Sequence, residues 1–281
     1  MELPGGAAAT IDRFLDACDQ AVPGLVVGLH VVGSLVLGDY RSDRSDIDVV
    51  VVVRTPPDRV QSSLLAGVHR VVAAHIDGPY LTELQLAGAP LDLGPVAHHV
   101  DGRFEVVRCH EVSPVTWAIL AYDAITVRGR SPAELGLRSD PSSVQAFSAA
   151  NLRDYWSNWA TTIAALIAAT DDDETIEAGL LEWGVLGSAR VDCAATTGRV
   201  VSKRAGGEYV RSRVGPEWHA LIDLALDIRA GRIDEVEVAD LRAACTFVHM
   251  LADADADADA DPGEVGEAGE VDTGPARGWN G

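Results

Sequence analysis

The sequence predicts an α+β protein in which an α/β domain is followed by an all-helical domain. β-rich segments alternate with amphipathic helices in the first part of the chain, whereas from Ser113 onward the apolar residues follow helical spacing. The stretch 130–141 contains Ser131-Pro132 and Asp140-Pro141, which interrupt regular structure. We therefore expect one domain over residues 1–130 and a helical domain over residues 131–252.

The first domain contains the clearest strand of the chain. Five successive valines, Val49–Val53, show no polar alternation, which indicates a strand covered on both faces, and Pro56-Pro57 ends it. A helix with apolar residues at helical spacing precedes it, behind a Thr10 N-cap. In chain order we expect a helix at 10–21, strands at 25–32 and 46–53, a helix at 58–75, and strands at 80–86 and 104–108.

The second domain is expected to be helical throughout. Its predicted helices are 142–169, 174–197, 207–214, 216–230 and 238–251, after a helix at 115–122. Residues 253–281 begin with Asp-Ala repeats and continue as a Gly/Glu/Pro mixture. Because so much like charge cannot pack, we expect this tail to be disordered.

Composition narrows the class of protein. The formal net charge of −21 argues against nonspecific nucleic-acid binding, which depends on Lys and Arg. The four cysteines are scattered without C-x-x-C spacing, as in reduced cytoplasmic proteins. The N-terminus lacks a basic signal-peptide region, and no apolar run reaches membrane-spanning length. We expect a cytoplasmic protein without membrane contact.

The most informative motif joins Gly33-Ser34 to Asp46-Ile47-Asp48. Residues alternate sides along a strand, so Asp46 and Asp48 point to the same face. Two adjacent carboxylates repel each other and are typically held together by a divalent cation such as Mg²⁺. Gly33 and Ser34 can offer a backbone N–H and a hydroxyl to a phosphate. The motif predicts metal-dependent phosphoryl or nucleotidyl transfer, against the alternative of a solvated turn.

Three further residues have a functional and an ordinary interpretation. Glu83, on the strand expected at 80–86, can complete the metal set or take a proton from an acceptor hydroxyl. Its alternative is an outward-facing charge on an edge strand. Arg44 can add positive charge near the phosphates or be a surface residue. Lys203 lies in a loop between two predicted helices, and nothing local identifies a function for it.

The Gly-Ser…Asp-x-Asp signature is similar to that of the DNA polymerase β-type nucleotidyltransferase superfamily. Over residues 20–251 the chain more specifically resembles the aminoglycoside (3'')(9) adenylyltransferases. In that family Tyr-Gly-Ser-Ala precedes Ser-Asp-Ile-Asp-Leu-Leu-Val, which here read Val32-Gly33-Ser34-Leu35 and Ser45–Val51. Its helical domain carries an Arg, then Thr-Gly-x-(Ile/Val)-x-(Pro/Ser)-Lys and an aromatic, as at Arg190, 197–203 and Tyr209.

The resemblance implies a nucleotidyltransferase domain, with a mixed sheet and flanking helices, joined to a helical bundle, with ATP and Mg²⁺ between them. It implies that Asp46, Asp48 and Glu83 form the catalytic and metal-binding set. It also implies that Lys203 contacts the ATP phosphates, together with Gly33, Ser34, Arg44 and Arg190. The family's Trp-Arg-Tyr-Pro segment, which contributes to streptomycin contacts, has no counterpart at 89–100.

We therefore expect an enzyme that moves AMP from ATP to a hydroxyl of a small acceptor; the sequence does not give its oligomeric state, and a monomer is favoured. The resemblance names an aminoglycoside such as streptomycin or spectinomycin. The same chemistry on another small molecule, a protein hydroxyl or an RNA end is one alternative, and the acidic charge weighs against RNA. A nucleotide-binding regulatory module without turnover is the other.

Overall fold

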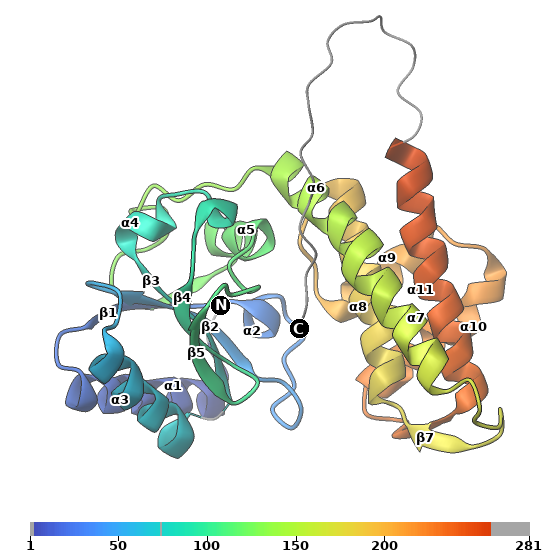
Figure 1. Cartoon of the computed structure of the whole chain (residues 1–281), viewed down its shortest axis with the longest axis horizontal. Helices are drawn as coiled ribbons and strands as arrows, with labels where there is room; N and C mark the ends of the chain where they lie inside the picture. Colours follow the sequence, from blue (N-terminus) through green and yellow to red (C-terminus); the bar gives the residue numbers. More distant parts are fainter. Residues whose placement is uncertain (1–2, 74, 260–281) are drawn as a thin grey trace, which may run out of the picture.

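The computed structural model describes residues 3–73 and 75–259, which form two domains side by side (Figure 1). The N-terminal domain is built on a six-stranded sheet with the order β5-β4-β3-β2-β1-β6. Strands β2 and β3 run parallel, and the other neighbouring pairs run antiparallel. The expected mixed sheet is confirmed.

The elements of this domain follow the chain in a simple order. The strands are β1 (Val26–Val31), β2 (Ile47–Val53), β3 (Ile76–Thr82), β4 (Val96–Val100), β5 (Arg103–Val107) and β6 (Ile125–Arg128). The helices are α1 (Gly5–Ala21), α2 (Gly33–Val36), α3 (Arg59–Val72), α4 (Glu83–Leu86) and α5 (Pro114–Tyr122), with the 3₁₀ turn η1 (Pro90–Asp92). Helices α1 and α3 lie together on one face of the sheet (Figure 1).

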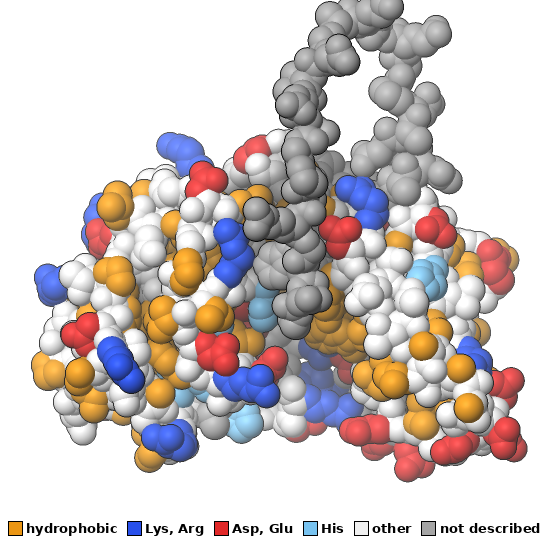
Figure 2. Space-filling model, viewed as in Figure 1, with side chains coloured by type: hydrophobic (Ala, Val, Ile, Leu, Met, Phe, Trp, Pro, Cys, Tyr) orange, Lys and Arg blue, Asp and Glu red, His pale blue; other side chains and the backbone are white. Residues whose placement is uncertain are grey.

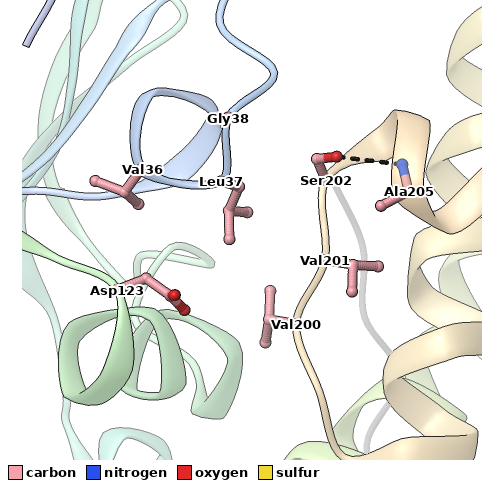
Figure 3. Close-up of a pocket in the computed structure, with 8 residues that line it drawn as sticks. All are labelled: Val36, Leu37, Gly38, Asp123, Val200, Val201, Ser202 and Ala205. Carbon is pink, nitrogen blue, oxygen red and sulfur yellow. Dashed lines mark hydrogen bonds between the residues drawn. The ribbon is translucent and has the colours of Figure 1, made fainter. Parts of the chain in front are cut away.

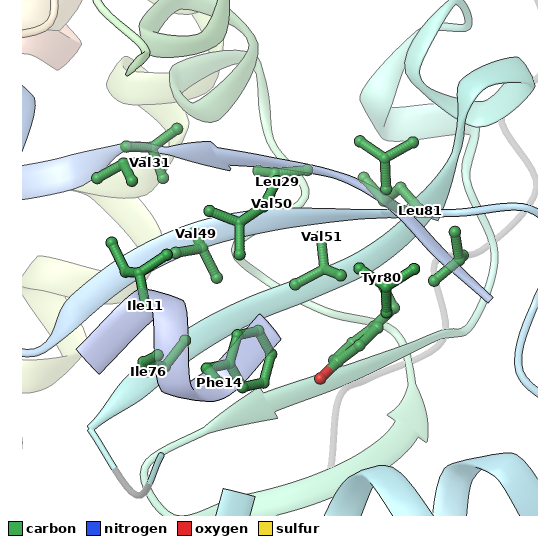
Figure 4. Close-up of a cluster of buried hydrophobic side chains, with 14 of the residues drawn as sticks. Ile11, Phe14, Leu29, Val31, Val49, Val50, Val51, Ile76, Tyr80 and Leu81 are labelled. Carbon is green, nitrogen blue, oxygen red and sulfur yellow. The ribbon is translucent and has the colours of Figure 1, made fainter. Parts of the chain in front are cut away.

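The core of the N-terminal domain explains the uninterrupted valine run. Residues Val49–Val53 of β2 are at most 2% exposed, because β2 lies at the centre of the sheet between β1 and β3. Ile11 and Phe14 of α1, which are fully buried, lie in the same apolar cluster as these valines (Figure 4). The prediction of a strand covered on both faces is therefore confirmed.

The helical domain is organised around α8 (Gly179–Thr197), which contacts α6, α9, α10 and α11. The other elements are α6 (Pro141–Asn151), the π-helical segment η2 (Leu152–Trp156), α7 (Ser157–Leu166), α9 (Lys203–Arg211), η3 (Pro216–Trp218), α10 (His219–Arg229) and α11 (Val238–Asp259). A small sheet of β7 (Thr175–Glu177) and β8 (Glu235–Glu237) closes one end of the bundle. The connection between the domains runs from Gly129 to Asp140 and contains the boundary predicted at residue 130.

The strand expected at 80–86 differs from the structure in extent and type. It begins at Ile76 and ends at Thr82, and Glu83 is the first residue of the short helix α4. The Thr82 side chain accepts a hydrogen bond from the Gln85 backbone N–H, and the Gln85 side chain accepts one from the Thr82 N–H. This reciprocal capping box stops the strand and starts the helix.

The end of the chain also differs from expectation. Helix α11 continues to Asp259, seven residues into the stretch predicted to be disordered from residue 253. Alanine has the highest helix propensity, so Asp-Ala repeats can extend a helix that is already nucleated by packing. Residues 260–281 of that predicted tail lie outside the described residues.

None of the helices in the described part of the chain is long and apolar enough to cross a membrane.

Two glycines of α8 make room for the tryptophans of the neighbouring segment. A Cβ atom at Gly184 would lie 2.2 Å from the Trp159 ring, and one at Gly187 would lie 2.3 Å from the Trp156 ring. Trp156 is 2% exposed, so its ring has no free space to enter. The tight approach of η2 and α7 to α8 therefore requires glycine at these positions.

We predict that Gly187→Leu destabilises the protein by about 1–3 kcal/mol, because the added side chain overpacks the contact with Trp156. Urea unfolding followed by circular dichroism measures this loss. Gly179→Ala, also in α8, is the matched control, since nothing lies within 4 Å of a Cβ there. A Gly187→Leu protein as stable as the control would contradict this packing.

Candidate active site

The Asp48 carboxylate, at the start of β2, occupies the space that a side chain at position 33 would need. Gly33 has φ +63°, which favours glycine, and a Cβ there would lie 1.9 Å from Asp48 Oδ2. The Ser34 backbone N–H donates a hydrogen bond to the Asp48 carboxylate, and the Val32 N–H donates to the Asp48 carbonyl oxygen at 2.9 Å. The turn that contains Gly33 and Ser34 is thus bonded to the strand that contains Asp48.

The electrostatic environment of Asp48 is unfavourable to its charge. Burial, helped by the nearby charges of Glu111 and Asp77, raises the pKa of Asp48 to about 7. The Ser34 N–H and the positive charge of Arg190 oppose this shift. The ionised form of Asp48 is therefore disfavoured where it stands. A cation bound beside the carboxylate would stabilise that ionised form.

Asp46 lies just before β2 and is half exposed. Its Oδ1 atom is 3.3 Å from Nδ1 of His75, and its pKa is raised by burial and by the charge of Asp77. Residues 46 and 48 are two apart at the start of one strand, so their side chains share a face. The charge of Asp77 raises the pKa of both Asp46 and Asp48, so the two predicted aspartates lie near one common carboxylate.

Asp77 is a third carboxylate that sequence reasoning missed. In the parallel pair of β2 and β3, Asp48 is directly opposite Asp77. Its Oδ1 atom is 2.9 Å from Nδ1 of the buried His99, and its Oδ2 atom accepts the Asp101 backbone N–H at 3.1 Å. The signal in the sequence was an acidic residue close before Pro79-Tyr80, but the predicted strand began too late to include it.

Glu83 does not join this group. In the register of β2 and β3, Thr82 pairs with Val53, at the opposite end of β2 from Asp48. Five residues of extended chain separate Asp77 from Thr82, which places Glu83 about 17 Å or more from the aspartates. Glu83 is instead paired with Arg130 at 3.0 Å on the surface. The prediction that it sits on a strand beside Asp46 and Asp48 is wrong.

Two cationic side chains of the helical domain, Arg190 and Lys203, lie on its side of the domain boundary, which we call the second wall of the site, opposite the aspartates. Burial lowers the pKa of Arg190 in α8, and the charges of Glu111 and Asp48, which belong to the other domain, oppose that shift. Lys203, predicted to lie in a loop, is the first residue of α9, and the Ser202 side chain caps that helix. Burial also lowers the pKa of Lys203.

Arg44 connects the two domains. Its guanidinium lies 2.6 Å from the carboxylate of Asp234, which follows α10, and 3.7 Å from Asp43. A second connection joins Arg229 of α10 to Asp39, through the carboxylate at 3.3 Å and the carbonyl oxygen at 2.7 Å. Arg44 therefore faces the interdomain space, but it has a carboxylate partner there.

The space between the domains is hollowed. In Figure 2, Lys and Arg side chains gather in the recess between the two lobes. A cavity of about 270 Å³ lies at this junction, between the end of α2 and the segment before α9 (Figure 3). It is lined by Val36, Leu37, Gly38, Asp123, Val200, Val201, Ser202 and Ala205.

The acidic residues fit a magnesium ion that is shared with a nucleotide. Among the described residues, no group of three or more His, Cys, Asp or Glu side chains is arranged to hold a metal ion. Magnesium in phosphoryl-transfer sites is usually held by one or two carboxylates, and substrate phosphates and waters complete its shell. The Asp46–Asp48 pair, with the uncompensated charge of Asp48, meets that requirement.

Comparison with known proteins places both domains. Residues 11–102 match the nucleotidyltransferase domain family, and residues 145–254 match the C-terminal domain family of aminoglycoside adenylyltransferases. The fold is similar to that of spectinomycin adenyltransferase AAD(9) from Enterococcus faecialis, solved with ATP and spectinomycin. That match has a TM-score of 0.61 and 14% sequence identity and covers 88% of this chain and 99% of the other. No curated protein matches the chain.

We predict that Asp48→Asn stabilises the protein at pH 8. Since the pKa of Asp48 rises from 3.8 to about 7 on folding, protonated Asp48 favours the folded state. That contribution is complete below pH 3.8 and is lost as the pH rises through about 7. Asparagine carries no such penalty, so the Tm difference between variant and wild type should grow from pH 5 to pH 8.

Asp223→Asn is the matched control for this measurement. The hydrogen bond from Arg211 lowers the pKa of Asp223, so its ionised form stabilises the fold and its removal gives no gain at pH 8. An Asp48→Asn protein with the same Tm shift at both pH values would contradict the charge environment described for Asp48.

Proposed function

We propose that this chain, which belongs to the aminoglycoside adenylyltransferase-like family of nucleotidyltransferases, transfers AMP from ATP to a hydroxyl group of an aminoglycoside. The observation that carries the proposal is that the acidic residues of the site belong to one domain and the basic residues Arg190 and Lys203 to the other. The partly buried Asp48 and Glu111 of the N-terminal domain act on Arg190 across the domain boundary. The N-terminal domain matches the nucleotidyltransferase domain family, and the C-terminal domain matches that of the aminoglycoside adenylyltransferases. Free, buried cysteines and an ATP-dependent reaction support a cytoplasmic location.

Asp46 and Asp48 are the residues that would hold Mg²⁺. When bound, Mg²⁺ offsets negative charge on the phosphate oxygens and on the leaving pyrophosphate. Asp48 is the better-positioned of the two, because Gly33 and the Ser34 N–H fix its carboxylate. The half-exposed Asp46 can adjust to the nucleotide.

In this proposal the Gly33-Ser34 turn and basic side chains of both domains bind the triphosphate. Gly33 lets the backbone approach the phosphates closely, and Ser34 offers its hydroxyl. Lys203 and Arg190 approach from the helical domain, and Arg44 adds positive charge at the edge of the recess. These cations compensate charge that develops on the pyrophosphate as it leaves.

Asp77 takes the role that the sequence assigned to Glu83. The acceptor hydroxyl oxygen attacks the α-phosphorus, a new O–P bond forms, and the bond to the bridging oxygen of pyrophosphate breaks. The hydroxyl proton passes to a carboxylate acting as general base. The register of β2 and β3 puts Asp77 beside Asp48, and His99 and the Asp101 N–H hold it in place.

The acceptor is proposed to be a cationic aminocyclitol or aminoglycoside, with spectinomycin and streptomycin as first candidates. The similar protein, spectinomycin adenyltransferase AAD(9), was solved with ATP and spectinomycin. A net charge of −21 favours a cationic acceptor over an anionic one.

Pyrophosphate release from MgATP, measured with a panel of aminoglycosides, tests the function. We expect release that depends on an acceptor, with an adenylylated acceptor detectable by mass spectrometry. Asp48→Asn should reduce turnover at least about 100-fold, because a ligand of the metal is lost. ATP binding without release under any acceptor would support the regulatory module instead, and full activity of Asp48→Asn would refute the site.

A second measurement separates the two candidates for the third carboxylate. We predict that Asp77→Asn lowers kcat by about 10²–10⁴-fold, as expected for loss of a general base. Glu83→Gln should leave kcat within about twofold, because it breaks only an exposed ion pair with Arg130. The reverse order of the two effects would restore Glu83 to the site.

A further inference from the structure

Glu182 occupies an unusual position next to the proposed phosphate contacts. It lies in the first turn of α8, and its side chain is 9% exposed. Its Oε1 atom accepts from Lys203 Nζ at 3.2 Å and from a nitrogen of the Arg229 guanidinium at 3.2 Å. One buried carboxylate is therefore shared by two cations of two other helices.

Lys203 is held on a second side by an aromatic ring. Its ammonium lies 4.9 Å from the centroid of the Trp183 ring, a cation–π contact. Within the described residues, Glu182 is the one carboxylate with which Lys203 forms an ion pair. The ammonium is thus held between the Glu182 carboxylate and the Trp183 ring.

Arg229 differs from Lys203 in having other acceptors. It also binds the Asp39 carboxylate at 3.3 Å and the Asp39 carbonyl oxygen at 2.7 Å. Arg229 is therefore anchored whether or not Lys203 is present, and it keeps Glu182 paired. Departure of Lys203 does not leave a buried carboxylate without a cation, which would be costly.

We propose that Glu182 competes with the triphosphate of ATP for Lys203, so that ATP binds by drawing the lysine away from this carboxylate. The inference rests on the proposed function, in which Lys203 contacts the outer phosphates. A lysine suits such an exchange, because its flexible four-carbon side chain carries a point charge that can turn between two acceptors. The retained pair with Arg229 lowers the cost of the exchange, because Glu182 still has a cationic partner when Lys203 leaves.

A structural role for Glu182 and a competing role have opposite consequences. If Glu182 only positioned Lys203 toward the phosphates, removing its charge would weaken ATP binding. If Glu182 competes, removing its charge frees the ammonium and strengthens ATP binding. The sign of the change therefore distinguishes the two roles.

Isothermal titration calorimetry, which measures the Kd of the full chain for MgATP and for AMP, tests the proposal. We predict that Glu182→Gln lowers the Kd for ATP by about tenfold, the size of one charge-assisted hydrogen bond no longer in competition. The Kd for AMP should stay within about twofold, because AMP lacks the outer phosphates. In a Lys203→Met background, Glu182→Gln should leave the Kd for ATP unchanged, because the competing partner is gone.

Two variants control for folding. Asp223→Asn removes a carboxylate of α10 that pairs with Arg211, which lies in α9 as Lys203 does. This substitution should leave the affinities for ATP and AMP unchanged. If Glu182→Gln does not fold, Glu182→Asp keeps the charge and withdraws it from Lys203 by one methylene. It should shift the ATP Kd in the same direction by a smaller factor.

The outcomes separate this inference from the proposed function. Weaker or unchanged ATP binding by a folded Glu182→Gln, with wild-type binding intact, would overturn the competition alone. A tighter Kd that persists in the Lys203→Met background would overturn it as well. If neither the wild type nor Glu182→Gln bound ATP, the proposed function would fail and this inference with it.

Discussion

The structure of the site depends on one steric and electrostatic constraint, the contact between Gly33 and Asp48. An Asp48 carboxylate oxygen fills the volume that a side chain at position 33 would need, so the turn after β1 must contain glycine there. The same contact directs the Ser34 N–H to the carboxylate. The charge is thereby fixed at a partly buried place where ionisation is disfavoured, and the energy for holding it there comes from the packed valine strand behind it.

The two domains carry complementary halves of the charge. Burial raises the pKa of Asp48 on one wall and lowers the pKa of Arg190 and Lys203 on the other, so each wall disfavours the charge it must use. The pairs Arg44–Asp234 and Arg229–Asp39 hold the walls opposite each other. Such opposed pKa shifts cluster at functional sites.

Local sequence patterns predicted the fold class, the central strand and the aspartate motif, because each depends on residues close together in the chain. The valine run and the Asp46–Asp48 spacing are of this kind. The third carboxylate could not be assigned in this way, since it depends on which residue of β3 pairs with Asp48. The capping box at Thr82 and Gln85 ends β3 before Glu83 and so excludes it, although Glu83 fits the strand pattern. The contact of Lys203 with Glu182 joins residues of two helices, and no spacing rule describes it.

The matched shifts on the two walls give a physical reason for metal and nucleotide to act as one ligand. A cation at Asp48 removes the repulsion from Glu111 and Asp77, while a triphosphate satisfies Lys203 and Arg190 on the other side. Either charge alone would enter a recess that holds both signs, and it would be attracted by one wall and repelled by the other. In the proposed function, a magnesium–nucleotide complex would bring positive charge to Asp48 and negative charge to Lys203 and Arg190. Its binding would relieve both walls at once, which neither free metal nor free nucleotide would do.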